Sequence, residues 1–255
     1  FGEDGYTYIG EYKNNEANGL GIEKYTSEGI NVVYEGEFKD WKRNGQGSLT
    51  LSNGASFKGE WVDNLLNGFV VEILSDGRKY EGNYKDGKRN GQGTFVFPDG
   101  QNYQGEWLNN EIHGYGIYNY LNAKYEGEFR AGKRNGKGTI TFSNEEKYQG
   151  DWENDLFNGQ GVYIWADGQT YIGEYKNDIR NGYSIEIYSD GSMFFGEKND
   201  LIQQKGLKVN SFNKIISVTD NGVSVTTELE KDIIISDTIN KLNELTLFDQ
   251  IFVHD

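Results

Sequence analysis

The sequence has 255 residues, of which 15% are aromatic and 35 are Gly, and its net charge at pH 7 is −15. The aromatic content excludes a disordered chain, and a single Pro without a three-residue Gly period excludes a collagen-like one. The acidic surface repels phosphate backbones and anionic bilayers, so nucleic acid is not expected as a partner.

The chain has no Cys, which excludes disulfides and thiolate metal sites. Its apolar runs are all shorter than the roughly 18–20 residues that a membrane span needs. Met193 is the only Met. We therefore expect the sequence to be a piece of a longer protein.

A motif of aromatic, Gly and aromatic residues at alternate positions recurs along the first three quarters of the chain. Its clearest copy is residues 103–116, which read Y-Q-G-E-W-L-N-N-E-I-H-G-Y-G. The other copies begin 22 or 23 residues apart, with one step of 26, at Tyr8, Tyr34, Phe57, Tyr80, Tyr125, Tyr148, Tyr171 and, in part, Phe194. The chain is therefore an array of repeats.

Each repeat predicts a β-hairpin. Residues 57–62 alternate as a first strand, with Phe57, Gly59 and Trp61 on one face. An Asn-Gly pair such as Asn67-Gly68 is expected to form the hairpin turn, because both residues tolerate positive φ. A second strand and an Asp-Gly turn, such as Asp99-Gly100, follow.

Stacked hairpins cover one another's edges and aromatic rows, as in a solenoid. The recurring Gly pairs leave slots into which rings can lie. Residues 27–33 contain three extra residues, which we expect to lengthen a loop. The predicted fold class is all-β: an elongated, twisted, single-layer sheet of tandem β-hairpins with a small C-terminal mixed cap.

A longer period of about 46 residues is superimposed on the repeat. Alternate hairpin loops carry a basic pair, at Lys42-Arg43, Lys88-Arg89 and Lys133-Arg134. The loops between them carry apolar residues, at Leu65-Leu66, Ile112 and Leu156-Phe157. The array is expected to present two kinds of hairpin tip in alternation.

The repeat stops near residue 197, so we predict a repeat array over residues 1–197 and a separate segment over residues 198–255. In that segment, residues 214–219 and 223–227 flank a turn and predict a hairpin. Residues 233–235 predict a strand and residues 238–248 a helix. The segment either caps the last sheet edge or docks onto a partner and orders there.

No constellation in the sequence predicts catalysis. Residues 82–89 and 127–134 nearly match a phosphate-binding loop, but Arg stands where that loop needs Ser or Thr. The Glu that recurs at the fourth repeat position is a structural ladder, since a catalytic pair would be singular. His113 and His254 are far apart in the sequence and predict no metal site or triad. We expect no enzyme activity and no cofactor.

The main role that we predict for the rows of aromatic rings is to pack the core. A single layer nevertheless leaves one face uncovered, so part of the aromatic surface is expected to form an open groove. Together with the hairpin tips, the candidate partner-binding residues are Trp61, Trp107, Trp152, Tyr84, Phe129, Arg43, Arg89, Arg134, Leu66 and Phe157.

The motif Y-x-G-E-W…N-G-x-G, with D-G near the end of the unit, resembles the MORN-repeat family over residues 8–197. The resemblance implies an elongated sheet of hairpins. MORN arrays occur in radial spoke heads of cilia, in protist cytoskeletal scaffolds, at membrane contacts and beside enzyme domains. Departures from the pattern are Val70 and Ser184 for Gly, Asn83 for Glu, and Asn122-Ala123 and Glu145-Glu146 for Asp-Gly.

The leading hypothesis is a non-catalytic scaffold that binds protein partners through an aromatic groove and hairpin tips. The resemblance suggests a cytoplasmic place in the cytoskeleton or a ciliary axoneme, with another MORN protein as one possible partner. One alternative is a peripheral membrane or phosphoinositide-binding module. Another is a regulatory array of an enzyme whose catalytic domain lies outside this sequence.

Overall fold

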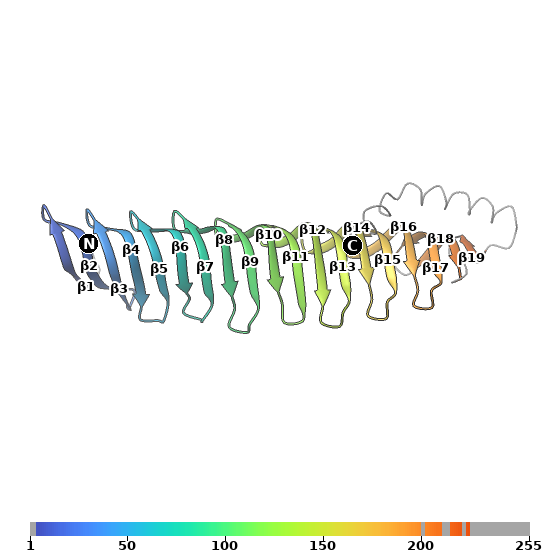
Figure 1. The fold of residues 1–255 in the computed structure, drawn as a ribbon, viewed down its shortest axis with the longest axis horizontal. Helices are drawn as coiled ribbons and strands as arrows, with labels where there is room; N and C mark the ends of the chain where they lie inside the picture. Colours follow the sequence, from blue (N-terminus) through green and yellow to red (C-terminus); the bar gives the residue numbers. More distant parts are fainter. Residues whose placement is uncertain (1–3, 200–201, 211–214, 221–222, 225–255) are drawn as a thin grey trace. The chain divides into compact units, whose positions relative to one another are not determined.

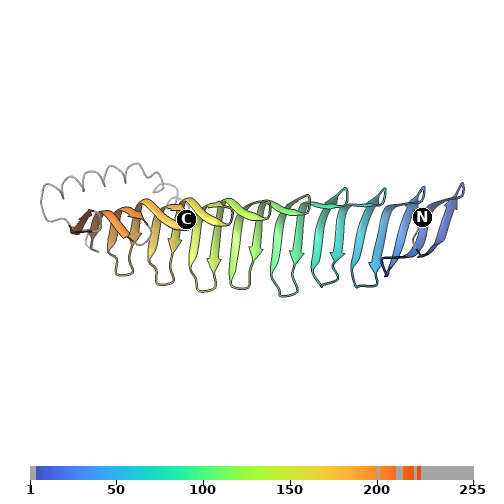
Figure 2. The same ribbon diagram turned by 180° about the vertical axis from the view of Figure 1, so that it is seen from behind.

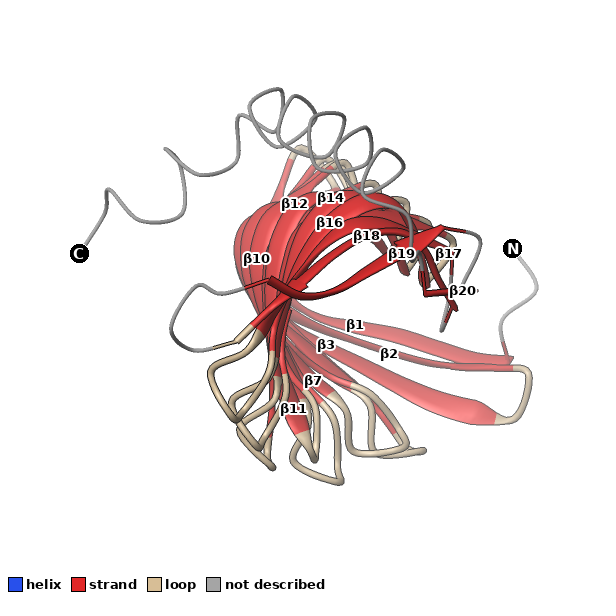
Figure 3. Cartoon of the chain, turned by 90° about the vertical axis from the view of Figure 1, so that its right-hand side faces the viewer, coloured by secondary structure: helices blue, strands red, loops and turns tan. Residues whose placement is uncertain are grey.

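The computed structural model describes residues 4–199, 202–210, 215–220 and 223–224. Figure 3 shows the strands in red joined by short tan turns. The predicted all-β fold of tandem hairpins is confirmed. The chain divides into two compact units, Phe1–Lys133 and Arg134–Asp255. The predicted strand at 233–235 and helix at 238–248 lie outside the described residues.

In the first unit, each strand pairs in antiparallel fashion with the next strand in the chain (Figure 1). These strands are β1 (Asp4–Lys13), β2 (Glu16–Ser27), β3 (Ile30–Lys39), β4 (Lys42–Leu51), β5 (Ser56–Val62), β6 (Leu65–Ile73), β7 (Lys79–Lys85), β8 (Lys88–Val96), β9 (Asn102–Leu108), β10 (Glu111–Asn119) and β11 (Ala123–Arg130).

The second unit has the same neighbour-to-neighbour pairing, seen from behind in Figure 2. Its strands are β12 (Lys133–Phe142), β13 (Lys147–Glu153), β14 (Leu156–Ile164), β15 (Thr170–Lys176), β16 (Ile179–Ile187), β17 (Met193–Asn199), β18 (Ile202–Val209), β19 (Ile215–Asp220) and β20 (Val223–Ser224).

The prediction that Asn-Gly forms the hairpin turn is wrong. The turns are two-residue loops a few positions earlier, such as Asp63 and Asn64 with φ of 48° and 71°. Two consecutive positive φ values are those of a type I′ turn, which matches the twist of a hairpin. The Asn-Gly pair instead lies inside the second strand, where the register shifts between Gly59 and Glu60. Gly68, with φ of 62°, supplies the left-handed residue of this bulge.

The second, Asp-Gly turn is confirmed. The Asp76 carboxylate accepts a hydrogen bond from the Arg78 backbone N–H at 3.1 Å, while Gly77 adopts a φ of 87°. The extra residues near 27–33 do not form a longer loop. They lengthen β2 and β3, which meet at a tight turn at Glu28 and Gly29.

The core of each repeat is a Tyr ring laid over a pair of facing glycines, as the predicted slot requires. Gly105 pairs with Gly116, and Tyr103 covers both. A Cβ atom at Gly116 would lie 2.4 Å from the Tyr103 hydroxyl, so only Gly fits there. That hydroxyl donates to the Glu106 carbonyl oxygen at 3.0 Å. The fully buried members of the row are Tyr34, Tyr80, Tyr103, Tyr125, Tyr148 and Tyr171.

Antiparallel pairing continues past residue 197. Gly196 on β17 pairs with Gly206 on β18, which repeats the facing glycines of the array. Beyond it, β19 pairs with β20 through Thr219 and Ser224, which confirms the predicted hairpin in this segment. The division at residue 197, and the role of residues 198–255 as a cap or docking segment, stay predictions.

Candidate interaction surface

Each unit presents two faces, because directly opposite residues of paired strands lie on the same side of a sheet. The aromatic face carries the Tyr row and the facing glycines. The outer face carries the residues between them, such as Gln104 and Glu106 on β9. On β9 the aromatic-face residues are buried and the alternate residues Gln104, Glu106 and Leu108 are exposed.

The predicted aromatic candidates are covered by their own chain. Trp61, Trp107 and Trp152 are only 4%, 6% and 4% exposed, and Tyr84, Phe129 and Leu66 are also buried. Phe157 is half-buried and stacks on Tyr148 at 3.7 Å between ring centroids.

The Trp rings are held by specific contacts. Trp107 packs edge-on against Tyr103, with centroids 5.5 Å apart, and its indole N–H donates to the Gly93 carbonyl oxygen at 3.2 Å. These rings therefore pack the core. That any of them contacts a partner stays a prediction.

The Arg residues of the basic pairs do not project from the hairpin tips, contrary to the sequence-based expectation. The Arg89 guanidinium lies over Phe95 and Trp107, 4.7 and 5.4 Å from their ring centroids, and pairs with the buried Glu72 carboxylate at 2.8 Å. Arg43 likewise pairs with Glu23 at 2.7 Å. The attraction between a cation and a ring is stronger when the cation is partly removed from water, so this geometry stabilises the aromatic face.

In the second unit, Arg134 behaves in the same way. Its guanidinium lies 4.2 Å from the Trp152 ring centroid, and it pairs with Asp155 at 3.1 Å. The three Arg candidates thus take part in internal packing, and their role toward a partner stays untested.

On the aromatic face, the 46-residue alternation is a packing pattern. Hairpins with Trp place an apolar residue opposite it, in the pairs Trp61–Leu66, Trp107–Ile112 and Trp152–Phe157. Three hairpins with Phe or Tyr place Arg opposite, in the pairs Phe38–Arg43, Tyr84–Arg89 and Tyr175–Arg180, whereas the first hairpin places Ala17 opposite Tyr12. The Arg of one hairpin then covers the Trp of the next, as Arg43 covers Trp61 at 5.6 Å. The packing pattern therefore repeats every two hairpins.

Sequence reasoning missed three of the rings that remain partly open on this face. Phe97, Tyr118 and Tyr120 of the first unit are half-buried. Tyr118 and Tyr120 stack at 4.2 Å, and Phe97 lies 4.9 Å from Phe95. Their signal in the sequence is an aromatic residue two or four positions after the second Gly of the motif.

The Glu ladder runs along the outer face and has a structural role, as predicted. The Glu106 carboxylate accepts the Tyr115 backbone N–H at 3.1 Å, and Glu37 accepts that of Gln46 at 2.9 Å. In the second unit Asp151 does the same for Gln160 at 2.9 Å. These carboxylates cap the N–H group that follows the bulge Gly.

The outer face of the first unit has an alternation of its own. The residue that follows the bulge Gly is large, exposed and apolar or aromatic in every second hairpin: Leu20, Phe69 and Tyr115 are 62%, 61% and 52% exposed. In the hairpins between them this residue is Gln46 or Gln92.

The residue two positions later follows the same alternation, with Ile22, Val71 and Ile117 against Ser48 and Thr94. We call Leu20, Phe69 and Tyr115 the outer anchors. Sequence reasoning missed them because it followed the loops, although their signal is plain in N-G-L-G, N-G-F-V and H-G-Y-G.

The predicted alternation of hairpin tips is confirmed for the residues that point to the outer face. Val62 pairs with Leu65 at one tip, and both are exposed. Lys85 pairs with Lys88 at the next tip, and both are exposed. The apolar tip Val62–Leu65 thus stands in line with Phe69, and the basic tips Lys39–Lys42 and Lys85–Lys88 stand in line with Gln46 and Gln92.

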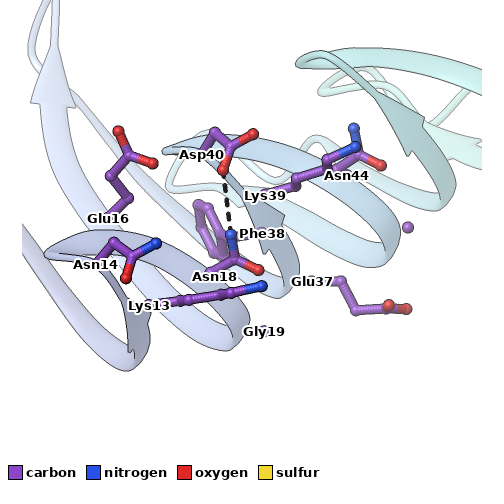
Figure 4. Close-up of a pocket in the computed structure, with 11 residues that line it drawn as sticks. Lys13, Asn14, Glu16, Asn18, Gly19, Glu37, Phe38, Lys39, Asp40 and Asn44 are labelled. Carbon is purple, nitrogen blue, oxygen red and sulfur yellow. Dashed lines mark hydrogen bonds between the residues drawn. The ribbon is translucent and has the colours of Figure 1, made fainter.

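A depression of about 480 Å³ lies between the tips of the β1–β2 and β3–β4 hairpins (Figure 4). Asn18 donates from its side-chain amide to Asp40 at 3.2 Å across it. Its charged lining has both signs, since Lys13 and Lys39 stand with Glu16. Within the described residues, no group of three or more His, Asp or Glu side chains could hold a metal ion.

The model of the MORN repeat matches the chain in eight segments: 8–29, 34–56, 57–77, 80–102, 103–122, 125–146, 148–170 and 171–193. The chain belongs to the MORN-repeat family. Members of this family are generally non-catalytic repeat proteins that bind proteins or membranes. The matched segments coincide with the packed hairpins, including those with Val70, Asn83 and Ser184.

No curated protein matches this chain. Among solved structures it is similar to a streptogramin B lyase, with 10% identity, 89% of each chain covered and a TM-score of 0.18. It is also similar to a catalytically inactive virginiamycin B lyase from Staphylococcus aureus with quinupristin. That match has 10% identity, covers 88% of this chain and 75% of the other, and has a TM-score of 0.15. Likenesses this weak carry no argument about activity.

In the described part of the chain, no helix has the length and apolar character needed to cross a membrane.

Proposed function

We propose that this MORN array is a non-catalytic scaffold that binds a protein partner on the outer face of the Phe1–Lys133 unit. The observation that carries the proposal is the set of outer anchors. Contiguous exposed apolar surface marks interaction sites, and each anchor is extended by the half-buried apolar residue two positions later on its strand.

The spacing of the anchors supports an extended contact. Phe69 on β6 and Tyr115 on β10 are separated by four strand steps, which is about 19 Å at the usual strand spacing. Half-buried Val71 and Ile117 widen each anchor. A partner long enough to contact both Phe69 and Tyr115 would bury both anchors at once. Linked contacts of this kind raise overall affinity.

The wider setting is also a proposal. A scaffold of this kind suits a cytoplasmic cytoskeletal or ciliary axonemal assembly, with a second MORN protein as a candidate partner. Only the family resemblance supports that setting. The family resemblance also leaves open the alternative that the array regulates an enzyme domain.

One specific observation favours a membrane surface as the second candidate. The outward tips Lys39, Lys42, Lys85 and Lys88 alternate with the apolar tips Val62 and Leu65. Each basic residue near an anionic surface contributes about 1 kcal/mol. The net charge of −15 opposes such binding. We therefore place protein binding first.

The proposal is tested with the double variant Phe69→Ser/Tyr115→Ser. Its matched control is Gln46→Ser, which changes the same repeat position in an intervening hairpin. Proteins captured by the wild-type chain from cells of its source are quantified by mass spectrometry for all three chains.

We expect the control to retain the captured set and the anchor variant to lose it. Equal recovery by the anchor variant would contradict the proposal. Flotation with anionic vesicles that is abolished by Lys-to-Ser changes at Lys39, Lys42, Lys85 and Lys88 would favour the membrane candidate instead.

A further inference from the structure

The surroundings of Phe69 differ from those of the other two outer anchors. A shallow depression of about 230 Å³ lies beside it, lined by Phe69, Glu81, Asn83, Gln92, Thr94 and Gln104. These residues come from β6, β7, β8 and β9, so the depression lies within the first unit.

The first difference, relative to Tyr115, is an unpartnered carboxylate. Within the described residues, no side chain hydrogen-bonds to Glu81 or forms an ion pair with it. Glu126, at the equivalent position beside Tyr115, is bonded by the Tyr115 hydroxyl and the Lys124 ammonium, each at 3.1 Å. The Lys124 contact holds the pKa of the Glu126 carboxyl below its ordinary value. Glu81 is thus an anion for which the chain supplies no donor.

The second difference is a gap in the Glu ladder. Asn83 stands opposite Phe69 where the other repeats of the first unit place Glu. A Cβ atom at Gly91 would lie 3.3 Å from Asn83, whereas one at Gly45 would lie 2.6 Å from the Glu37 carboxyl carbon. The shorter, uncharged side chain leaves the depression open. The amides of Asn83, Gln92 and Gln104 are part of its lining, and their oxygen atoms accept N–H donors.

The third feature is the exposed ring. Phe69 is 61% exposed, so its face is open to a cation. On the aromatic face, the chain combines a ring and a carboxylate to hold its own arginine: Arg89 lies over Phe95 and pairs with Glu72. The depression presents the same two elements with no arginine of its own.

Building on the proposed function, we propose that this depression receives an arginine side chain from the partner protein. The planar guanidinium stacks on the Phe69 ring and donates to the Glu81 carboxylate, while its remaining N–H groups reach the amide oxygens of Asn83 or Gln104. A guanidinium presents five donors in one plane, which suits this spread of acceptors. A lysine ammonium is compact and strongly hydrated, and it suits the site less well.

Half-buried Val71 and the exposed apolar tip at Leu65 flank the depression along β6. The partner segment therefore carries its arginine next to apolar residues. The occupant is a short arginine-containing peptide segment of a protein.

The test uses the 255-residue chain and random 12-residue peptides displayed on phage, selected on the wild-type protein and counter-selected on Glu81→Gln. We expect arginine to be enriched in the selected peptides. Affinities of the best peptide are then measured by fluorescence anisotropy, with the arginine replaced in turn by citrulline and lysine. Citrulline keeps the shape of arginine and removes its charge.

We expect citrulline to weaken binding about tenfold or more, and lysine to weaken it by a smaller factor. Phe69→Ala and Glu81→Gln should each cause a similar loss. The matched control is Glu35→Gln, which lies in the same row beside the aliphatic Leu20 and should leave binding unchanged. Unchanged circular dichroism confirms that each variant is folded.

Equal binding of the citrulline or lysine peptide, or an equal loss in Glu35→Gln, would overturn the inference. Binding of phosphatidylcholine vesicles that Phe69→Ala abolishes would also overturn it, since the cation would then be a lipid headgroup. If Phe69→Ser/Tyr115→Ser loses its captured proteins while citrulline binds as well as arginine, the scaffold function stands and only the arginine inference fails.

Discussion

The aromatic face and the outer face of the first unit follow the same two-hairpin alternation for different reasons. On the aromatic face it closes a core: Arg89 of one hairpin covers Trp107 of the next and is neutralised by Glu72. On the outer face it leaves side chains open, since Phe69 and Tyr115 are more than half exposed. A period of about 46 residues therefore contains two superimposed patterns, one that packs the chain's own core and one that leaves apolar side chains exposed.

The difference between the faces comes from where the polar groups find partners. On the aromatic face, the hydroxyl of Tyr103, the indole N–H of Trp107 and the guanidinium of Arg89 all bond within the chain. On the outer face, the ladder carboxylates cap backbone N–H groups, but Glu81 has no bonding partner among the described residues. Recognition is expected where such a carboxylate stands beside an exposed ring, as Glu81 does beside Phe69.

The largest expected effect tests the closed face through pH. Burial raises the pKa of Tyr34, Tyr80 and Tyr103 well above the ordinary value of 10.0. Since the folded pKa is the higher one, the stabilisation is fully present below pH 10 and is lost as pH rises toward the folded pKa. Each such ring then destabilises the fold by about 1.4 kcal/mol per pH unit.

We therefore expect a steep alkaline transition in which circular dichroism and tyrosinate absorbance change together. Tyr34→Phe should make that transition less steep, because one buried ionisable group is removed. Gradual ionisation of these rings near pH 10 in a chain that stays folded would show that the aromatic face is open.

The second effect separates a structural Arg from a partner-binding one. Arg89→Ala leaves the buried Glu72 carboxylate without its cation, so we expect a loss of about 3 kcal/mol in the free energy of unfolding, measured by chemical denaturation. Lys88→Ala, one residue earlier and exposed, should change it by less than about 0.5 kcal/mol.

The compensating variant Arg89→Met/Glu72→Gln should recover most of the lost stability, because no uncompensated charge remains. If Arg89→Ala were as stable as Lys88→Ala, the guanidinium would be free for a partner, as the sequence alone suggested.

The hairpin array could be predicted from the sequence because its signals are local. An aromatic residue and Gly at alternate positions fix which residues face inward, and Asp76-Gly77 marks a turn through its own side-chain hydrogen bond. The position of the other turn could not be predicted in the same way. Asn67-Gly68 is equally suited to a turn and to a bulge, and the choice depends on Glu60, whose carboxylate lies over Gly68 on the neighbouring strand.

The candidate site was less predictable, because a loop position does not determine which way a side chain points. Lys88 and Arg89 are neighbours in the sequence, but β-strand alternation sends one outward and the other onto Trp107. Leu65 and Leu66 diverge in the same way, one exposed and one buried. The outer anchors could have been found from the residue between the glycines, had its alternation been followed.

The smallest expected effect tests the open face. Phe69→Ser/Tyr115→Ser should change the free energy of unfolding by less than about 0.5 kcal/mol, because neither side chain is buried in the folded chain. Trp107→Ser, which removes a ring that is 6% exposed, should cost several-fold more in the same denaturation measurement. Anchors that stabilised the isolated chain as much as Trp107 would belong to its core, and the apolar alternation on the outer face would then need no partner. If the anchors do not stabilise the fold, the free energy gained by burying their apolar surface is available for binding.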